Sequence, residues 1–409
     1  MKFPAKKSDS KKENHIKALA GLRGLCAIAV IYSHIKSDLF PTFNVVGHHA
    51  VIFFFFQSSF LVSYHLLMQW RKLVASMDLS STSKLQILTK KVSARMWCNY
   101  ALKRFFRIYP LFALVLIMIY FGPSFFDDSY GQIRDTSTIF QHLLLYKCRS
   151  LFWTIPFEIV FYFVAPLVVI SYDFFVSFFR IFINRHFKSK MFFVFCILII
   201  SQILFCALVP EFYYPIPTFS LGCFTGFIWA EYHYAKKGLE PQYLDIVDNG
   251  SHKSQTKSEQ RKKETGFRVF FDLFCYVNAL IFYFSLDSDF PTRRAPFSWW
   301  KPRIFDSVMF SNITMAIVFF PGSFSRIFEW NFLQFAGKIS YSLYLTHPMS
   351  LLISESIFSC IFSAKIVAPE EIHFNKSVLG IAISLAIGSF FHFIIEKPAI
   401  NFGSKIMKA

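Results

Sequence analysis

Long apolar runs dominate this chain and restrict what it can fold into. Ten stretches of mostly apolar residues recur along its 409 residues, and each approaches the roughly 18 to 25 residues that cross a bilayer as a helix. They lie at 17–36, 46–67, 108–126, 151–172, 191–209, 213–231, 267–286, 303–321, 339–362 and 377–396. Only 17% of the residues are charged and 54% are hydrophobic. The sequence therefore predicts an all-α polytopic membrane protein with about ten transmembrane helices.

The distribution of basic residues predicts how the chain is oriented. The net charge is +18, but the basic residues lie in short runs between apolar segments, which is typical of cytoplasmic loops and not of a nucleic-acid-binding surface. Alternate loops and the two tails together carry about four times as many Lys and Arg as the remaining loops. We therefore expect both termini to be cytoplasmic and no nucleic-acid partner.

Three regions follow from these patterns. We expect a basic cytoplasmic tail at 1–16, a transmembrane domain at 17–398 and a second cytoplasmic tail at 399–409. Within the domain, 68–107 and 232–266 are expected to be cytoplasmic loops, the second a polar linker held near anionic lipid headgroups. The first apolar run contains an arginine and no small-residue cleavage site, which favours a retained span over a cleaved signal peptide.

The chemistry must come from polar residues inside the apolar runs. The sequence has no P-loop, nucleophile elbow or dinucleotide fingerprint. Its eight cysteines form no CxxC pair and no Cys/His cluster at metal-ligand spacing, so we expect neither a metal site nor a disulfide framework. Ionisable residues within spans mark a proton path, an ion path or a catalytic centre. Those in or near the predicted spans are Arg23, His34, Glu158, His347 and Glu396, with Asp272 and Asp306 nearer to span ends.

The first span carries two of these residues on one face. Arg23 and His34 are eleven residues apart, which is three helical turns and about 16 Å of rise. Gly21 and Gly24 are small enough to let a neighbouring helix approach closely. Two simpler explanations stay open: Arg23 reaches to the inner membrane surface, and His34 is a hydrogen-bonded histidine near the outer interface.

The third predicted span is preceded by an arginine pair. Arg104 and Arg107 are three residues apart and share a helical face. Two guanidinium groups there would form a fork for phosphate. On this stretch alone, however, the positive-inside rule is a sufficient explanation.

Two later stretches also carry polar residues at helical spacing. Glu158 lies in an otherwise apolar segment, where a carboxylate needs an Arg or His partner from another helix. Ser340, Tyr344 and His347 follow i, i+4, i+7 spacing and so share one face, where interhelical hydrogen bonding is the default role. Further polar or aromatic neighbours are Trp153, Thr154 and Tyr341.

These stretches, in this order, resemble the acyltransferase 3 family of membrane enzymes from about Leu19 to Pro398. The residues that match the family's motifs are Gly21, Leu22, Arg23, Gly24 and His34; Arg104, Arg107, Ile108 and Pro110; Trp153, Thr154, Ile155, Glu158, Phe161 and Tyr162; and Ser340, Tyr341, Tyr344, Leu345, His347, Glu396 and Pro398. The departures are Ala20 for an aspartate, Ser58 and Ser59 for a Ser-Gly pair, and Thr154 for a serine. They weaken any transfer of acceptor specificity.

The resemblance implies an O-acyltransferase. Such an enzyme moves an acyl group, expected to be acetyl, from cytoplasmic acyl-CoA to a hydroxyl of an extracytoplasmic or lumenal acceptor, expected to be a carbohydrate. Acetyl-CoA would be a co-substrate, with no cofactor bound permanently. The implied catalytic residues are His34 as base or acyl carrier, with Arg23 and Glu158. The implied donor-binding residues are Arg104, Arg107 and Tyr109, and the supporting residues are Trp153, Thr154, Tyr341, Tyr344, His347 and Glu396.

Two other functions stay open. In a proton-coupled small-solute transporter, Arg23, His34 and Glu158 would form a proton relay. The second alternative is a catalytically inactive membrane scaffold. In each case the protein would be embedded among lipids as a multi-pass protein of the plasma membrane, or of the endoplasmic reticulum or Golgi in a eukaryote. Because the chain stops about eleven residues after Pro398, we expect it to act alone or with a separate partner protein.

Overall fold

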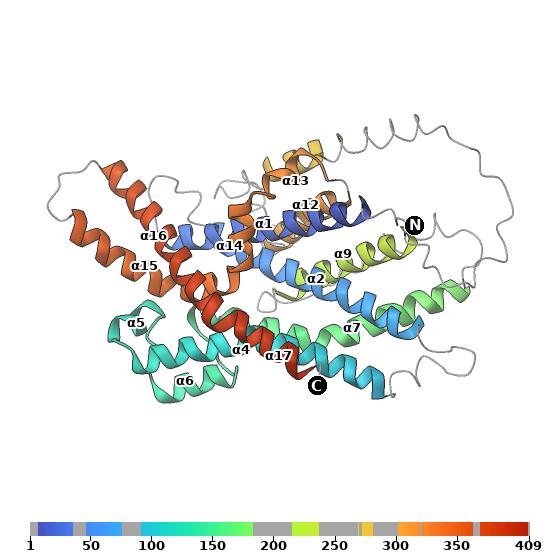
Figure 1. Ribbon diagram of the computed structural model, residues 1–409, viewed down its shortest axis with the longest axis horizontal. Coiled ribbons are helices and arrows are strands. Elements are labelled where there is room, and N and C mark those ends of the chain that lie inside the picture. The colour runs from blue at the N-terminus through green and yellow to red at the C-terminus, as the bar shows by residue number, and fades with distance from the viewer. Residues whose placement is uncertain are drawn as a thin grey trace, which may run out of the picture. The chain divides into compact units, whose positions relative to one another are not determined.

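The computed structural model describes residues 7–35, 46–75, 91–182, 215–236, 269, 272–280, 302–319, 321–362 and 369–407 (Figure 1). Within these residues the chain forms helices joined by turns, and no β-strand occurs. Five helical segments are long and apolar enough to cross a membrane: Lys17–Ile35, Val46–Ala75, Ser93–Phe121, Ser150–Val176 and Glu371–Ile406. The all-helical prediction is therefore confirmed for the described residues, and at least five long apolar helices fit a polytopic membrane protein.

The described helices follow the predicted apolar runs. In chain order they are α1 (Lys7–Ile35), α2 (Val46–Ala75), α4 (Lys91–Phe121), α5 (Ser124–Ser129), α6 (Thr136–Leu143), the 3₁₀ helix η2 (Ser150–Trp153), α7 (Thr154–Phe182), α9 (Pro215–Lys236), α12 (Pro302–Phe319), α13 (Ser323–Ile327), α14 (Asn331–Lys338), α15 (Ser340–Phe362), α16 (Pro369–Phe391), the π-helical η6 (His392–Glu396) and α17 (Lys397–Ile406).

Several helices differ in length from the predicted spans. α2 continues to Ala75 and α4 begins at Lys91, so much of the range 68–107 is helical, because helical hydrogen bonds form within one segment and do not stop at a membrane surface. α4 ends at Phe121, before the predicted 126, where Gly122 and Pro123 follow; proline has no N–H to continue a helix. α17 occupies most of the expected tail 399–409.

Not every predicted span can be compared with a helix. The runs 213–231, 303–321 and 339–362 form α9, α12 and α15, which are not among the five segments that meet the length and hydropathy criteria for crossing. The run 191–209 lies outside the described residues, and of 267–286 only 269 and 272–280 are described. The number of ten spans and the cytoplasmic position of both termini stay predictions.

The chain divides into two compact units. Unit 1 contains residues 1–54, 96–162 and 325–409, and unit 2 contains residues 55–95 and 163–324. All twelve candidate site residues of the sequence analysis belong to unit 1.

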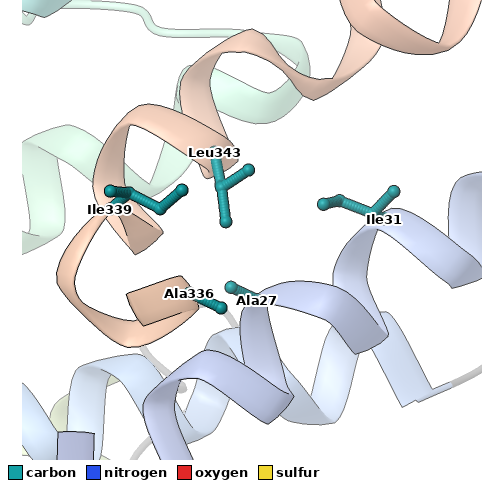
Figure 2. Close-up of a cluster of buried hydrophobic side chains, with 5 residues drawn as sticks. All are labelled: Ala27, Ile31, Ala336, Ile339 and Leu343. Atoms are coloured by element: carbon teal, nitrogen blue, oxygen red, sulfur yellow. The ribbon is translucent and has the colours of Figure 1, made fainter. Parts of the chain in front are cut away.

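The core of unit 1 is built on α1. This helix packs against α14, α15 and α16, and α15 packs against α16 (Figure 1). Figure 2 shows buried side chains of α1 facing those of α14, of α15 and of the residue that joins them. They are Ala27, Ile31, Ala336, Ile339 and Leu343. Small residues at two of these positions let the backbones approach closely, as in other membrane helix pairs.

Between α4 and α7 the chain folds back along α4. The hydroxyl groups of Tyr120 and Thr136 lie 3.1 Å apart, and the Tyr109 hydroxyl donates a hydrogen bond to the carbonyl oxygen of Leu143 (3.1 Å). α6 therefore runs antiparallel to α4. Tyr120 and Tyr109 are separated by about 16 Å along α4. Segment 122–153 therefore lies alongside α4 over this length and is not confined to its C-terminal end.

Internal hydrogen bonds hold this folded-back segment together. The fully buried His142 donates through Nδ1 to the Thr138 carbonyl (2.7 Å) and accepts the amide N–H of Arg149 at Nε2 (2.9 Å). The Tyr130 hydroxyl donates to the Leu345 carbonyl of α15 (2.7 Å). Burial raises the pKa of Tyr130, so this hydroxyl keeps its proton at neutral pH. Irregular backbone is tolerated at membrane depth when its polar groups are paired in this way.

Unit 2 contains a buried charge network that the sequence analysis missed. Arg71 of α2 pairs with Asp173 of α7 (Nε to Oδ1, 3.3 Å) and with both carboxylate oxygens of Glu231 of α9, one at 2.9 Å. Trp70 donates to Asp173 (3.0 Å) and Tyr172 donates to Glu231 (3.2 Å). The network therefore joins three helices of unit 2 that are far apart in the sequence.

Candidate active site

Two glycines set the position of Arg23. A methyl group added at Gly21 would overlap the carbonyl oxygen of Phe328 and lie 2.7 Å from its carbonyl carbon. One added at Gly24 would overlap the carbonyl oxygen of Leu333 and lie 2.7 Å from the amide nitrogen of Gly337. These neighbours are backbone atoms that cannot rotate away. Gly24 therefore lets α1 contact α14 directly, and Gly21 lets it contact the residue just after α13; together they fix the rotation of α1 about its axis.

Arg23 is partly buried and has several charged neighbours. Its guanidinium carbon is 5.8 Å from the centre of the Phe54 ring. Its Nε is buried and has no hydrogen-bond partner among the described residues. Arg107 of α4, Glu158 of α7 and Glu396 of η6 are close enough to act on its charge. The structure thus brings together four ionisable residues that the sequence analysis had singled out separately.

The second arginine, Arg104, packs between aromatic rings. Its guanidinium carbon lies 5.5 Å from the centre of the Tyr100 ring and 5.1 Å from that of Tyr162. Its Nε is also buried without a partner among the described residues. Tyr162 donates a short hydrogen bond to the Glu158 carboxylate, so Glu158 has the polar partner that an intramembrane carboxylate requires. α4 extends well before Arg104, and the pair therefore lies inside a continuous helix and not at its start.

Three candidate tyrosines use their hydroxyl groups on backbone carbonyls. Tyr109 donates to Leu143, Tyr344 donates to the Leu151 carbonyl (3.0 Å), and Tyr341 donates to the Ile108 carbonyl (2.7 Å). Each bond joins segments that are distant in the sequence. These hydroxyl protons hold the folded-back segment and α15 against the rest of unit 1.

Trp153 and Thr154 lie where η2 passes into α7. The Thr154 hydroxyl donates to the Leu151 carbonyl (3.4 Å) and the residue is buried. Trp153 contacts the edge of Phe157, with ring centres 6.0 Å apart. Both residues shape the start of α7, one to two turns before Glu158.

The two candidate histidines lie together. The rings of His34 at the end of α1 and His347 in α15 have centres 4.7 Å apart. His347 is 1% exposed and donates through Nδ1 to the Tyr344 carbonyl (2.7 Å). Its Nε2 is therefore the lone-pair nitrogen of the neutral ring, and this atom is buried without a hydrogen-bond partner among the described residues. His34 is exposed, so the pair combines an accessible imidazole with a buried one.

Sequence reasoning missed one residue of unit 1, His392. Its Nδ1 lies 2.9 Å from Oε2 of Glu396, which also accepts a hydrogen bond from the Ser342 hydroxyl (2.6 Å). The signal was present, since a His and a Glu four residues apart share a helical face. It was overlooked because the run 377–396 was treated as a span with a single terminal carboxylate.

Comparison with known proteins identifies the family. A protein-family model described as an acyltransferase domain, that of the acyltransferase 3 family, matches residues 16–395. The chain belongs to the acyltransferase 3 family. The match covers the arginines and histidines described above and Glu158, and it ends one residue before Glu396. This acyltransferase 3 protein is therefore a membrane-bound enzyme of the transferase class. No curated protein and no solved structure matches the chain.

Proposed function

We propose that this acyltransferase 3 protein moves an acetyl group from cytoplasmic acetyl-CoA to a hydroxyl of a carbohydrate on the extracytoplasmic or lumenal side of its membrane. The observation that carries the proposal is the presence of two groups of polar residues in unit 1, both including residues of α1. One is the arginine and carboxylate cluster around Arg23, and the other is the pair of His34 and His347. The first suits an anionic donor, and the second suits proton transfer.

The charge of the cluster favours an anion. Arg23, Arg104 and Arg107 face two carboxylates, those of Glu158 and Glu396, which leaves one formal positive charge in excess. Two buried guanidinium Nε atoms also lack hydrogen-bond partners among the described residues. Unpaired buried donors are costly, and phosphate oxygens bind guanidinium groups strongly. The phosphates of acetyl-CoA would balance the excess positive charge and accept hydrogen bonds from the two Nε atoms.

The distance along α1 suits the rest of the donor. About 16 Å of helix separates Arg23 from His34, which is similar to the reach of the pantetheine arm between the phosphates and the thioester. With the phosphates at the arginines, the thioester would lie near the histidine pair. Acyl transfer from one membrane side to the other requires such an extended donor.

His34 then acts as the base. It takes the proton of the acceptor hydroxyl while the hydroxyl oxygen forms a bond to the acyl carbon. The carbon–sulfur bond breaks, and the protonated imidazole returns the proton to the leaving CoA thiolate. In the alternative order His34 first takes the acetyl group, releases CoA and then passes the group on. Trapping an acetyl-imidazole in the wild type with radiolabelled acetyl-CoA, before acceptor is added, would distinguish the two orders.

Ligand-induced stabilisation tests the donor site. Acetyl-CoA at about one hundred times its dissociation constant adds about 2.7 kcal/mol to the folded state. We expect wild type and His34→Ala to be stabilised, whereas Arg23→Ala and the double variant Arg104→Ala/Arg107→Ala should not respond. Arg95→Ala is the matched control, because Arg95 is an exposed arginine of the same α4 helix.

Either of two results would overturn the proposal. A wild type that shows no shift with acetyl-CoA would remove the donor. An equal loss of response in the Arg95 control would show that the shift reports general charge and not this site.

A further inference from the structure

The carboxylate of Glu396 is held from two sides. The Ser342 hydroxyl and the His392 ring nitrogen Nδ1 both bond to its Oε2 atom, at 2.6 and 2.9 Å. Ser342, His392 and Glu396 are 0%, 4% and 3% exposed. A carboxylate is only an acceptor, so His392 is the donor through Nδ1–H. Charge-assisted bonds of this kind are stronger than neutral ones.

A π-helical turn presents His392 and Glu396 together. The amide of Lys397 donates to the carbonyl of His392, five residues earlier. Pro398 explains the wider turn, because it lacks an N–H and its ring would clash with the carbonyl of Ile394 in a regular α-helix. Single π turns inside long helices occur frequently at functional sites. His392 Nε2 is buried and has no hydrogen-bond partner among the described residues.

Glu396 is near Arg23 but does not pair with it. The carboxylate is close enough to interact with the charge of the Arg23 guanidinium. Between these two described residues, however, no ion pair or hydrogen bond forms. The bonds to His392 and Ser342 hold the Glu396 carboxylate in a position where it does not pair with Arg23. Arg23 therefore keeps an unpaired, buried guanidinium donor next to a restrained negative charge.

We propose that His392 is a positioning residue that restrains Glu396 from pairing with Arg23, so that the guanidinium stays available for a phosphate of the donor. This inference rests on the proposed acetyl-CoA site. A released Glu396 side chain would form an ion pair with Arg23 and compete with the phosphate. The Ser342 hydroxyl, which lies on α15, restrains the same Glu396 oxygen.

Variants of His392 separate this role from a general effect on folding. His392→Leu removes the donor to Glu396, and we expect the dissociation constant for acetyl-CoA to rise about tenfold, the effect of losing one hydrogen bond to a charged group. His392→Asn keeps an N–H at the position of Nδ1 and should bind like wild type. The double variant His392→Leu/Glu396→Gln lacks the competing charge and should recover wild-type affinity. Ser354→Ala is the matched control for the second donor, because among the described residues its hydroxyl bonds only to the Leu351 carbonyl of its own helix.

The experiment is a titration of each purified full-length variant with acetyl-CoA, alongside its melting temperature without ligand. If His392→Leu binds like wild type, or if the double variant stays as weak as the single one, the inference is overturned while the donor site stands. If His392→Leu does not fold, Ser342→Ala with and without Glu396→Gln gives the same comparison. A wild type that does not bind acetyl-CoA would overturn both the proposed function and this inference.

Discussion

The substitution Gly24→Ala tests whether the contact between α1 and α14 positions Arg23. An added methyl group would overlap the Leu333 carbonyl oxygen and lie 2.7 Å from the Gly337 nitrogen. Nonbonded atoms rest about 3.5 Å apart, so the two backbones must separate by about 0.8 Å or more. Overpacking of this kind costs about 1–3 kcal/mol. Alanine's higher helix propensity returns about 1 kcal/mol, which leaves a net loss of up to about 2 kcal/mol.

Gly380→Ala provides the matched control. The nearest atoms to a methyl group there are the side-chain ends of Ile35 and Leu351, both at 3.1 Å. These terminal methyl groups can move by a few tenths of an ångström through side-chain rotation. The helix-propensity gain of about 1 kcal/mol should then be kept, and the variant should be as stable as wild type or more stable.

The assay is the melting temperature of each purified variant in detergent, with and without acetyl-CoA. We expect Gly24→Ala to melt lower than wild type and to lose much of its response to the ligand, because Arg23 moves with α1. Gly380→Ala should retain both properties. Equal melting temperatures and equal responses in the two variants would refute the argument that backbone contact at Gly24 fixes Arg23.

Three further predictions concern other parts of the molecule. Arg71→Met should destabilise the protein by about 3–5 kcal/mol, because two buried carboxylates lose their cation; thermal melting measures this, and neutralising both carboxylates as well should restore stability. Tyr344→Phe should cost about 1 kcal/mol for one lost hydrogen bond while leaving the acetyl-CoA response in place, as the same melting assay would show. Burial raises the pKa of the Cys148 thiol from 9.0 to about 11, so at pH 8 its thiolate fraction is about one hundredfold lower than that of an ordinary thiol. Iodoacetamide should therefore label Cys148 slowly in the folded protein, faster as pH rises and fastest after denaturation, as followed by mass spectrometry; equal rates before and after denaturation would contradict this.

The sequence predicted several site residues individually. The eleven-residue spacing placed Arg23 and His34 on one face of α1, and the i, i+4, i+7 pattern placed Tyr344 and His347 on one face of α15. Both predictions follow from the geometry of one helix. The expectation that Glu158 has a polar partner agrees with the structure, because the Tyr162 hydroxyl of the same helix donates to its carboxylate and Arg23 of α1 is close enough to act on its charge.

Other features depended on contacts that no local pattern encodes. Arg71 falls in the predicted cytoplasmic loop 68–107, yet it is buried in α2 with two carboxylates from other helices. The return of segment 122–153 along α4 rests on hydrogen bonds between side chains and distant carbonyl groups, such as that of Tyr109. The role proposed for His392 depends on Ser342 of α15, which bonds to the same Glu396 carboxylate.

Membrane embedding and helix positions were determined by the sequence alone, because both depend on local properties. Transfer into lipid depends on the apolar content of one segment, and each helix satisfies its backbone hydrogen bonds within itself. Which polar groups meet was decided only by the tertiary structure. The approach of α1 to α14 through Gly24, and the 4.7 Å separation of the His34 and His347 rings, depend on how helices far apart in the sequence pack together. Close packing of side chains from several helices selects one such arrangement, and it brings together polar residues that are scattered along the sequence.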